Sequence, residues 1–139
     1  MKNTHALLLG LVALAAGASF SLTAQAQSLT QAEYKAEKEK ITATYKTDRA
    51  ACDKDKGNAK DICIAQAKGK EKIDKANLQE RYEPSEKHRY NARMAKADAD
   101  LNVAKERCDD QSGPAHDSCR KDAKAAHTAA KAQAKAQKK

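Results

Sequence analysis

Residues 52–63, CDKDKGNAKDIC, and residues 108–119, CDDQSGPAHDSC, decide how this chain is organised. Both segments follow the pattern C-D-x3-G-x-A-x-D-x-C, with the same spacing between the cysteines. At a fixed offset of 56 residues, the flanking sequences 34–76 and 90–132 also align without a gap and share fourteen identical positions. Because so specific a pattern is not expected twice from composition alone, the sequence predicts a tandem duplication.

Each copy has the sequence features of a helical hairpin. Thr30 and Glu33 form a capping-box pattern that places the first helix from about residue 31. Apolar residues then recur at helical spacing, whereas the period of two expected for a strand is absent. These positions are Tyr34, Ile41, Tyr45 and Cys52 in the first copy, and Tyr90, Ala97, Leu101 and Cys108 in the second, with Met94 beside them.

The second helix of each hairpin is predicted to start after the glycine of its cysteine loop. In the first copy Asn58 with Asp61 indicates the start, and in the second copy Gly113-Pro114 does. One face of this helix in the first copy carries Ile62, Ala65, Gly69, Ile73 and Ala76. Its counterpart in the second copy carries Ser118, Lys121, Ala125, Ala129 and Ala132, which provides almost no core.

The N-terminal residues have the pattern of an export signal. Lys2 precedes an apolar run of about fifteen residues, which is shorter than the roughly twenty needed to span a bilayer, and Ala24-Gln25-Ala26 fits a cleavage site. We therefore expect a periplasmic protein without a transmembrane anchor. The predicted organisation is a signal peptide (1–26), a first hairpin (27–83) and, after Pro84, a second hairpin with an Ala/Lys-rich basic tail (84–139).

Export to an oxidising compartment makes Cys52, Cys63, Cys108 and Cys119 candidates for disulfide bonds. Four cysteines allow three pairings, and the duplication favours Cys52–Cys63 with Cys108–Cys119. A bridge within each copy would staple a hairpin that has little apolar core. Bridges across the copies and metal binding are the alternatives, although the close cysteine pairs typical of zinc and redox sites are absent from the sequence.

Composition argues against an enzyme. The hydrophobic fraction is 40%, but most of it is alanine or lies in the first twenty residues, and aromatic residues make up 4%. So few large side chains cannot enclose the pocket that a metabolic enzyme needs. His88, His116 and His127 show no ligand spacing with one another and are interpreted as surface histidines. We expect no catalytic residues, no cofactor and no metal.

The net charge of +8 indicates an anionic partner. The tail from Arg120 onward is rich in lysine and has Asp122 as its only acidic residue. The candidate anion-binding residues are Lys121, Lys124, Lys131, Lys135, Lys138 and Lys139. Because an exported protein rarely meets nucleic acid, the expected partners are anionic envelope components or a periplasmic protein. A solvated Ala/Lys helix without a ligand is the alternative.

Two family resemblances bear on function. The signal peptide, the repeated cysteine loop, residues 57–63 and the KADAD segment at 96–100 resemble small exported Gram-negative proteins labelled TolA-like or cell-envelope biogenesis proteins. That resemblance implies an envelope location and no catalytic or binding residues. Residues 29–33, LTQAE, resemble the L-T-x-x-Q motif of Spy/CpxP-type periplasmic chaperones. The alternative function is therefore a stress chaperone that uses the apolar seam of Tyr34, Ile41, Tyr45, Tyr90, Met94 and Leu101.

Overall fold

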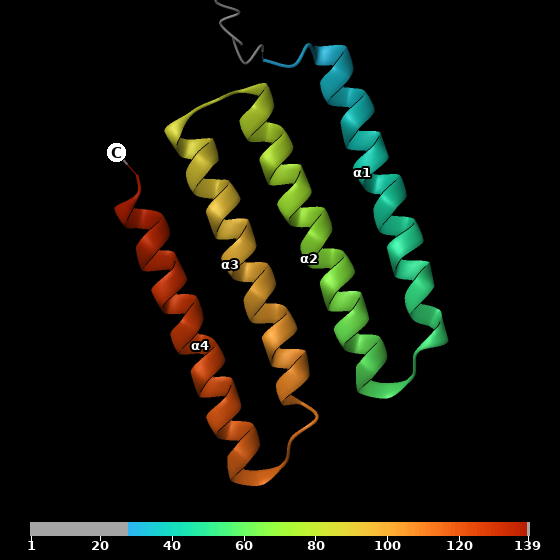
Figure 1. Ribbon diagram of the computed structural model, residues 1–139, viewed down its shortest axis with the longest axis vertical. Coiled ribbons are helices and arrows are strands. Elements are labelled where there is room, and N and C mark those ends of the chain that lie inside the picture. Colours follow the sequence, from blue (N-terminus) through green and yellow to red (C-terminus); the bar gives the residue numbers. More distant parts are fainter. Residues whose placement is uncertain (1–27, 139) are drawn as a thin grey trace, which may run out of the picture.

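The computed structural model describes residues 28–138 as an all-helical chain (Figure 1). Four α-helices follow one another: α1 (Gln31–Ala51), α2 (Gly57–Tyr82), α3 (Glu86–Cys108) and α4 (Gly113–Ala136). A short 3₁₀ turn, η1 (Cys52–Lys54), continues α1 into the first cysteine loop. Since these residues include no strand, the predicted all-α fold is confirmed. The predicted signal peptide lies outside the described residues.

Local signals explain where the helices begin. The Thr30 hydroxyl accepts a hydrogen bond from the backbone N–H of Glu33, and the Glu33 carboxylate accepts one from the N–H of Thr30, which confirms the capping box. Ser85 caps α3 in a similar way by accepting from the N–H of His88. Helices α2 and α4 begin instead at Gly57 and Gly113, whose φ angles are 56° and 58°. Glycine adopts this left-handed conformation without the steric cost of a side chain.

The predicted role of Asn58 with Asp61 in starting α2 is wrong. Helix α2 begins at Gly57, after an extended Lys56 that makes no side-chain cap. The amide of Asn58 donates instead to the backbone carbonyl oxygen of Glu106 on α3, at 2.7 Å. The left-handed glycine turns the chain into the helix one residue earlier, so Asn58 is already inside the first turn and contacts the neighbouring hairpin.

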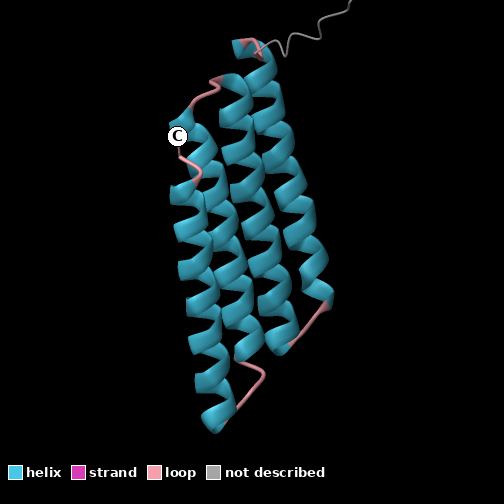
Figure 2. Cartoon of the chain, turned by 60° about the vertical axis from the view of Figure 1, so that its left-hand side comes forward, coloured by secondary structure: helices cyan, strands magenta, loops and turns pink. Residues whose placement is uncertain are grey.

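The four helices lie side by side in a single layer (Figures 1 and 2). Each helix is antiparallel to the next and packs only against its neighbours in the sequence, so α1 and α4 form two separate edges. A closed four-helix bundle would bring these two helices together. The layer therefore leaves two broad faces open.

The two hairpins pack together through α2 and α3. The predicted apolar face of α2 provides this contact: Gly69 approaches Ala99 so closely that a Cβ atom on Gly69 would lie 2.9 Å from the Cβ of Ala99. Leu78 follows Gly69 by nine residues, about two and a half turns, and so lies on the opposite side of α2, facing α1. The apolar face of α2 thus joins the repeats, whereas α1 packs against the other side.

The core consists mostly of small residues. The buried residues of the described chain are Cys52, Ala67, Gly69, Leu78, Ala92, Ala97, Ala99, Cys108 and Ala134. All six residues of the predicted apolar seam are only half-buried. The Tyr34 hydroxyl donates to Oε1 of Gln79 at 2.8 Å, and its ring lies 4.5 Å from that of Tyr82, measured between centroids. Hydrophobic burial is therefore modest, as the sequence predicts.

Both predicted disulfides are present. Cys52 pairs with Cys63 and Cys108 pairs with Cys119, and the Cα atoms are 5.6 Å apart in each pair. The first cysteine of each pair is fully buried. The bridges therefore staple each hairpin beside its turn, and no described cysteine is free.

Candidate functional site: the basic face

Shallow hollows between neighbouring helices define one face of the layer. Lys68 and Lys72 of α2 line one hollow with Lys105 of α3. Lys38 of α1 and Lys75 of α2 line a second hollow. On α2 the lining positions 61, 65, 68, 72, 75 and 79 follow steps of three and four residues. Since these steps keep side chains on one side of a helix, both hollows open on the same face.

The lysines of α4 extend this face. Asp98 of α3 lies on the same side as the hollow-lining positions 91, 102 and 105, and its carboxylate is 2.7 Å from Nε2 of His127 on α4. Lys124 and Lys131 lie one turn before and one turn after His127. The opposite side of α4, which lines hollows on the other face, contributes no lysine to them.

We call this side of the layer the basic face. Its defining residues are Lys38, Lys68, Lys72, Lys75, Lys105, Lys124, Lys131 and Lys135. The acidic residues beside them are fewer: Asp61 and Glu106 line one hollow, and Asp98 pairs with His127. Lys75 is also paired, at 2.6 Å from Glu71, whereas Lys68 and Lys72 are exposed and form no ion pair within residues 28–138. The face therefore has a net positive charge.

The opposite side, which we call the mixed face, has balanced charges. Three hollows lie on it; Ala104 and Arg107 of α3 line two of them, and Asp100 links one of these two to the third. Lys70 of α2 lines this face and lies 3.4 Å from Asp48 of α1 and 3.5 Å from Asp74. Partial desolvation acts to lower the pKa of Lys70, but its hydrogen bond to Asp48 and the two nearby carboxylates together raise that pKa.

The predicted anion-binding residues are only partly on the basic face. Lys124, Lys131 and Lys135 belong to it, and Lys121 is displaced toward the outer edge of α4. Lys138 lies with its Nζ 5.3 Å from the centroid of the Tyr90 ring. Lys139 lies outside the described residues. Sequence reasoning missed the lysines of α1, α2 and α3. The spacing of positions 68, 72 and 75 indicates that these lysines share one face of a helix. Which lysines of other helices lie on the same side of the layer depends on how the helices pack.

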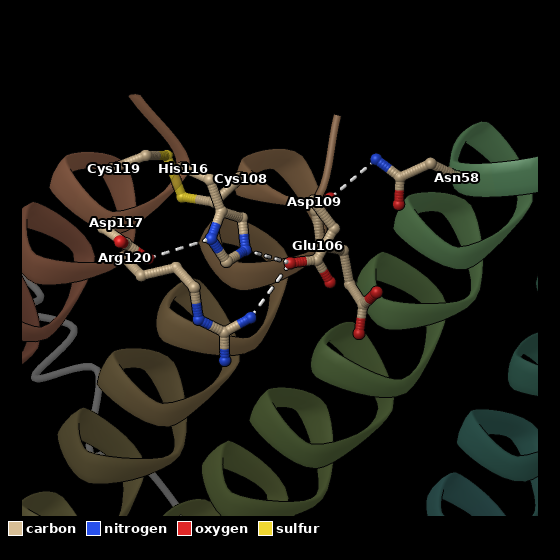
Figure 3. Close-up of a disulfide and its surroundings, with 8 residues drawn as sticks. All are labelled: Asn58, Glu106, Cys108, Asp109, His116, Asp117, Cys119 and Arg120. Atoms are coloured by element: carbon tan, nitrogen blue, oxygen red, sulfur yellow. Dashed lines mark hydrogen bonds and ion pairs between the residues drawn. A yellow bond between two sulfur atoms is a disulfide. The ribbon is translucent and has the colours of Figure 1, made fainter. Parts of the chain in front are cut away.

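The second cysteine loop holds a cluster of polar side chains. Near the Cys108–Cys119 bridge, Arg120 donates to Oδ1 of Asp109 at 2.9 Å, and Nε2 of His116 lies 3.2 Å from the same oxygen (Figure 3). His116, predicted to be a surface histidine, is half-buried and also contacts Asp117. Among residues 28–138, no three potential metal ligands lie close enough together to hold an ion.

Searches among known proteins add no assignment. No family model matches the chain, no curated protein is similar to it in sequence, and no solved structure matches its fold. Among the described helices, none combines the length and the apolar character needed to cross a bilayer. The functional argument therefore depends on the chemistry of the two faces.

Proposed function

We propose that this protein is a non-enzymatic periplasmic protein that binds anionic surfaces of the cell envelope through its basic face. The observation that carries the proposal is the separation of charge in a single layer, with an excess of lysines on one face, Lys68 and Lys72 unpaired among them, and balanced charges on the other. A flat layer can bring lysines from all four helices to a planar anionic surface at once. Curved or enclosed ligands would not engage so many of them.

The magnitude of the attraction supports surface binding. One lysine close to an anionic membrane contributes about 1 kcal/mol, and the field decays over about 8 Å at physiological ionic strength. Several lysines on one plane therefore give firm attachment at low salt and rapid loss of it as salt rises. The phosphate groups of phospholipids and of lipopolysaccharide are chemically similar targets, so both belong in the test.

Vesicle co-sedimentation tests the proposal. The protein should bind vesicles that contain phosphatidylglycerol, or lipopolysaccharide, and should not bind phosphatidylcholine alone. Lys68→Gln with Lys72→Gln should weaken binding about thirtyfold, from two contributions of about 1 kcal/mol. Arg93→Gln with Arg107→Gln removes the same charge from the mixed face and should have a much smaller effect. Equal losses, or no binding to either anionic target, would contradict the proposal.

The chaperone alternative has less support. The predicted client-binding seam is not freely accessible, because Tyr34 packs against Tyr82 and Gln79 of α2 and every residue of the seam is at least partly covered. Suppression of a model client's aggregation by an equimolar amount of this protein would favour that alternative.

A further inference from the structure

The mixed face has apolar side chains near its centre that the chain itself covers only in part. Ile73 of α2 and Val103 of α3 are half-buried and line a hollow of about 510 Å³ together with Ala99 and Ala104. Charged side chains of α2 and α3 surround them, namely Lys70, Asp74, Asp100 and Arg107. On α1, Ile41 lies on the same side as Asp48, two turns away. A single layer has no second layer to bury these side chains, whereas most helical folds pack two layers around a core.

Charge is arranged in two separate strips on either side of this apolar centre. The acidic strip belongs to α1 and consists of Glu33, Glu37 and Asp48, which follow one another at helical spacing. Two of these carboxylates already have a partner within the chain, since Glu37 lies 3.8 Å from Lys40 and Asp48 lies 3.4 Å from Lys70. The basic strip belongs to α3 and consists of Arg89, Arg93, Lys96 and Arg107. Arg89 pairs with Glu86 and Lys96 pairs with Asp100, so the unpaired charge of the strip comes from its two other arginines. Helix α2 lies between α1 and α3 and keeps most of these charges apart. Within residues 28–138, Arg93 and Arg107 form no ion pair.

We propose that the mixed face binds a second copy of this chain, about a two-fold axis that runs parallel to the helices and over α2. This axis places α2 on the partner's α2, and the acidic strip of each copy on the basic strip of the other. A two-fold contact is self-complementary by construction, so every favourable pairing occurs twice. Ile73 and Val103 would be covered beside the axis. Lys70 of each copy would lie near the partner's Lys70, with its charge balanced by Asp48 and Asp74 of its own copy.

The size of the contact is sufficient for a stable dimer. Helix α2 has 26 residues and is about 39 Å long. Three helices at about 9 Å spacing then give a contact on the order of 1,000 Å² per copy, compared with about 800 Å² in a standard interface. Both basic faces point outward in such a dimer. If the proposed function is correct, one dimer would bridge two anionic surfaces.

Sedimentation equilibrium of the oxidised protein, without lipid, tests the dimer. The wild type should dimerise, and Glu37→Lys or Arg93→Glu alone should weaken dimerisation about tenfold or more, because each places like charges opposite one another. The double variant should restore it, since the reversed strips again match. A wild type that stays monomeric at about 200 μM, or a double variant no better than the single ones, would overturn the proposal.

Cysteine cross-linking tests the position of the axis. Gln66 of α2 is an exposed residue that lines the hollow. In the Gln66→Cys variant, the new cysteine should form a disulfide with the same cysteine of the partner copy under mild oxidation. Asn91→Cys, on the basic face, is the matched control and should not. The reverse pattern would overturn the proposal. Vesicle binding is measured separately, so a failed dimer with intact vesicle binding refutes this inference and leaves the proposed function standing.

Discussion

Helices α2 and α4 occupy equivalent places in the two repeats but have different surroundings. Helix α2 is covered by α1 on one side and α3 on the other, whereas α4 contacts only α3. Ile62, Gly69 and Ile73 of α2 face the second repeat, but their counterparts at positions 118, 125 and 129 are Ser, Ala and Ala and are exposed. A polar or small outer surface is what ends a stack of repeats. The difference fits the place of α4 at an edge of the described layer.

The interior of each hairpin changes less than its outer surface. Cys52 and its counterpart Cys108 are both fully buried, and Leu78 and its counterpart Ala134 are both buried. By contrast, Ala43 is exposed on the outer side of α1, while its counterpart Ala99 is buried against Gly69. The duplication therefore repeats the hairpin, and position in the layer decides which surfaces are covered.

The largest expected effect comes from opening the disulfides. Replacement of either cysteine pair by serine should cost about 3 kcal/mol of unfolding free energy, because each bridge closes a loop of about twelve residues. The consequences should differ between the hairpins. Helix α1 buries no residue fully but places the large half-buried side chains of Tyr34, Ile41 and Tyr45 against α2, whereas the one buried residue of α4 is Ala134. Loss of Cys108–Cys119 should therefore abolish hydrogen-exchange protection along α4. Loss of Cys52–Cys63 should leave α1 partly protected. Equal protection of α1 and α4 in the two variants would contradict this asymmetry.

Leu78 should be the next most sensitive position. It is 2% exposed and is the only large aliphatic side chain that is buried among residues 28–138. Leu78→Ala should destabilise the protein by about 2 kcal/mol, at the lower end of the range for buried leucine, because a single layer can collapse into the space. Urea denaturation measures the loss. Ile64→Ala, at a half-buried position on the same helix, should cost clearly less; an equal cost would mean that Leu78 is not a special contact.

The contact between α2 and α3, which joins the two repeats, should not accommodate a larger side chain at Gly69. Gly69→Leu should destabilise by about 1–2 kcal/mol, because its side chain would collide with Ala99 and push α3 away from α2. Ala125→Leu makes a similar enlargement at the equivalent position of α4, which is exposed, and should change stability by less than about 0.5 kcal/mol. Thermal unfolding of the two variants, side by side, measures the difference. Similar losses of stability in the two variants would mean that position 125 of α4 is also packed against another helix, which contradicts the single layer.

The sequence predicts the hairpins better than their arrangement. The capping box, the cysteine pairs and the helix periods can be recognised from short stretches of sequence. The predicted cap at Thr30, the helix start at Gly113 and the pairing of all four cysteines are therefore confirmed. The partner of each helix face is a long-range property. The apolar face of α2 could be recognised from its spacing, but its contact with α3 and the gathering of lysines from several helices on one face depend on which helices are neighbours. Asn58 was misjudged for the same reason, since its partner is Glu106 of the other repeat.

The smallest expected effect concerns a charge pair that recurs across both cysteine loops. Lys60 lies 2.9 Å from Oδ1 of Asp53, and the equivalent pair in the second repeat is His116 with Asp109, at 3.2 Å. The hydrogen bond and charge of Lys60 lower the pKa of Asp53. A carboxyl whose pKa is lowered in the folded state stabilises that state above its ordinary pKa, and this contribution is lost as pH falls through the lowered value. The first loop should therefore loosen slightly in acid.

Titration of the Asp53 carboxyl by NMR measures this effect directly. Lys60→Gln removes the charge and the short contact, so the pKa of Asp53 should rise toward its ordinary value. Lys54→Gln removes the same charge from the same loop, where Lys60 remains bonded to Asp53, and should raise that pKa much less. Equal shifts in the two variants would mean that the overall positive charge of the loop, rather than the hydrogen bond from Lys60, lowers the pKa of Asp53. The contact between Lys60 and Asp53 would then contribute nothing specific to the first loop. The equivalent contact between His116 and Asp109 could not be taken as evidence that both loops are stabilised in the same way.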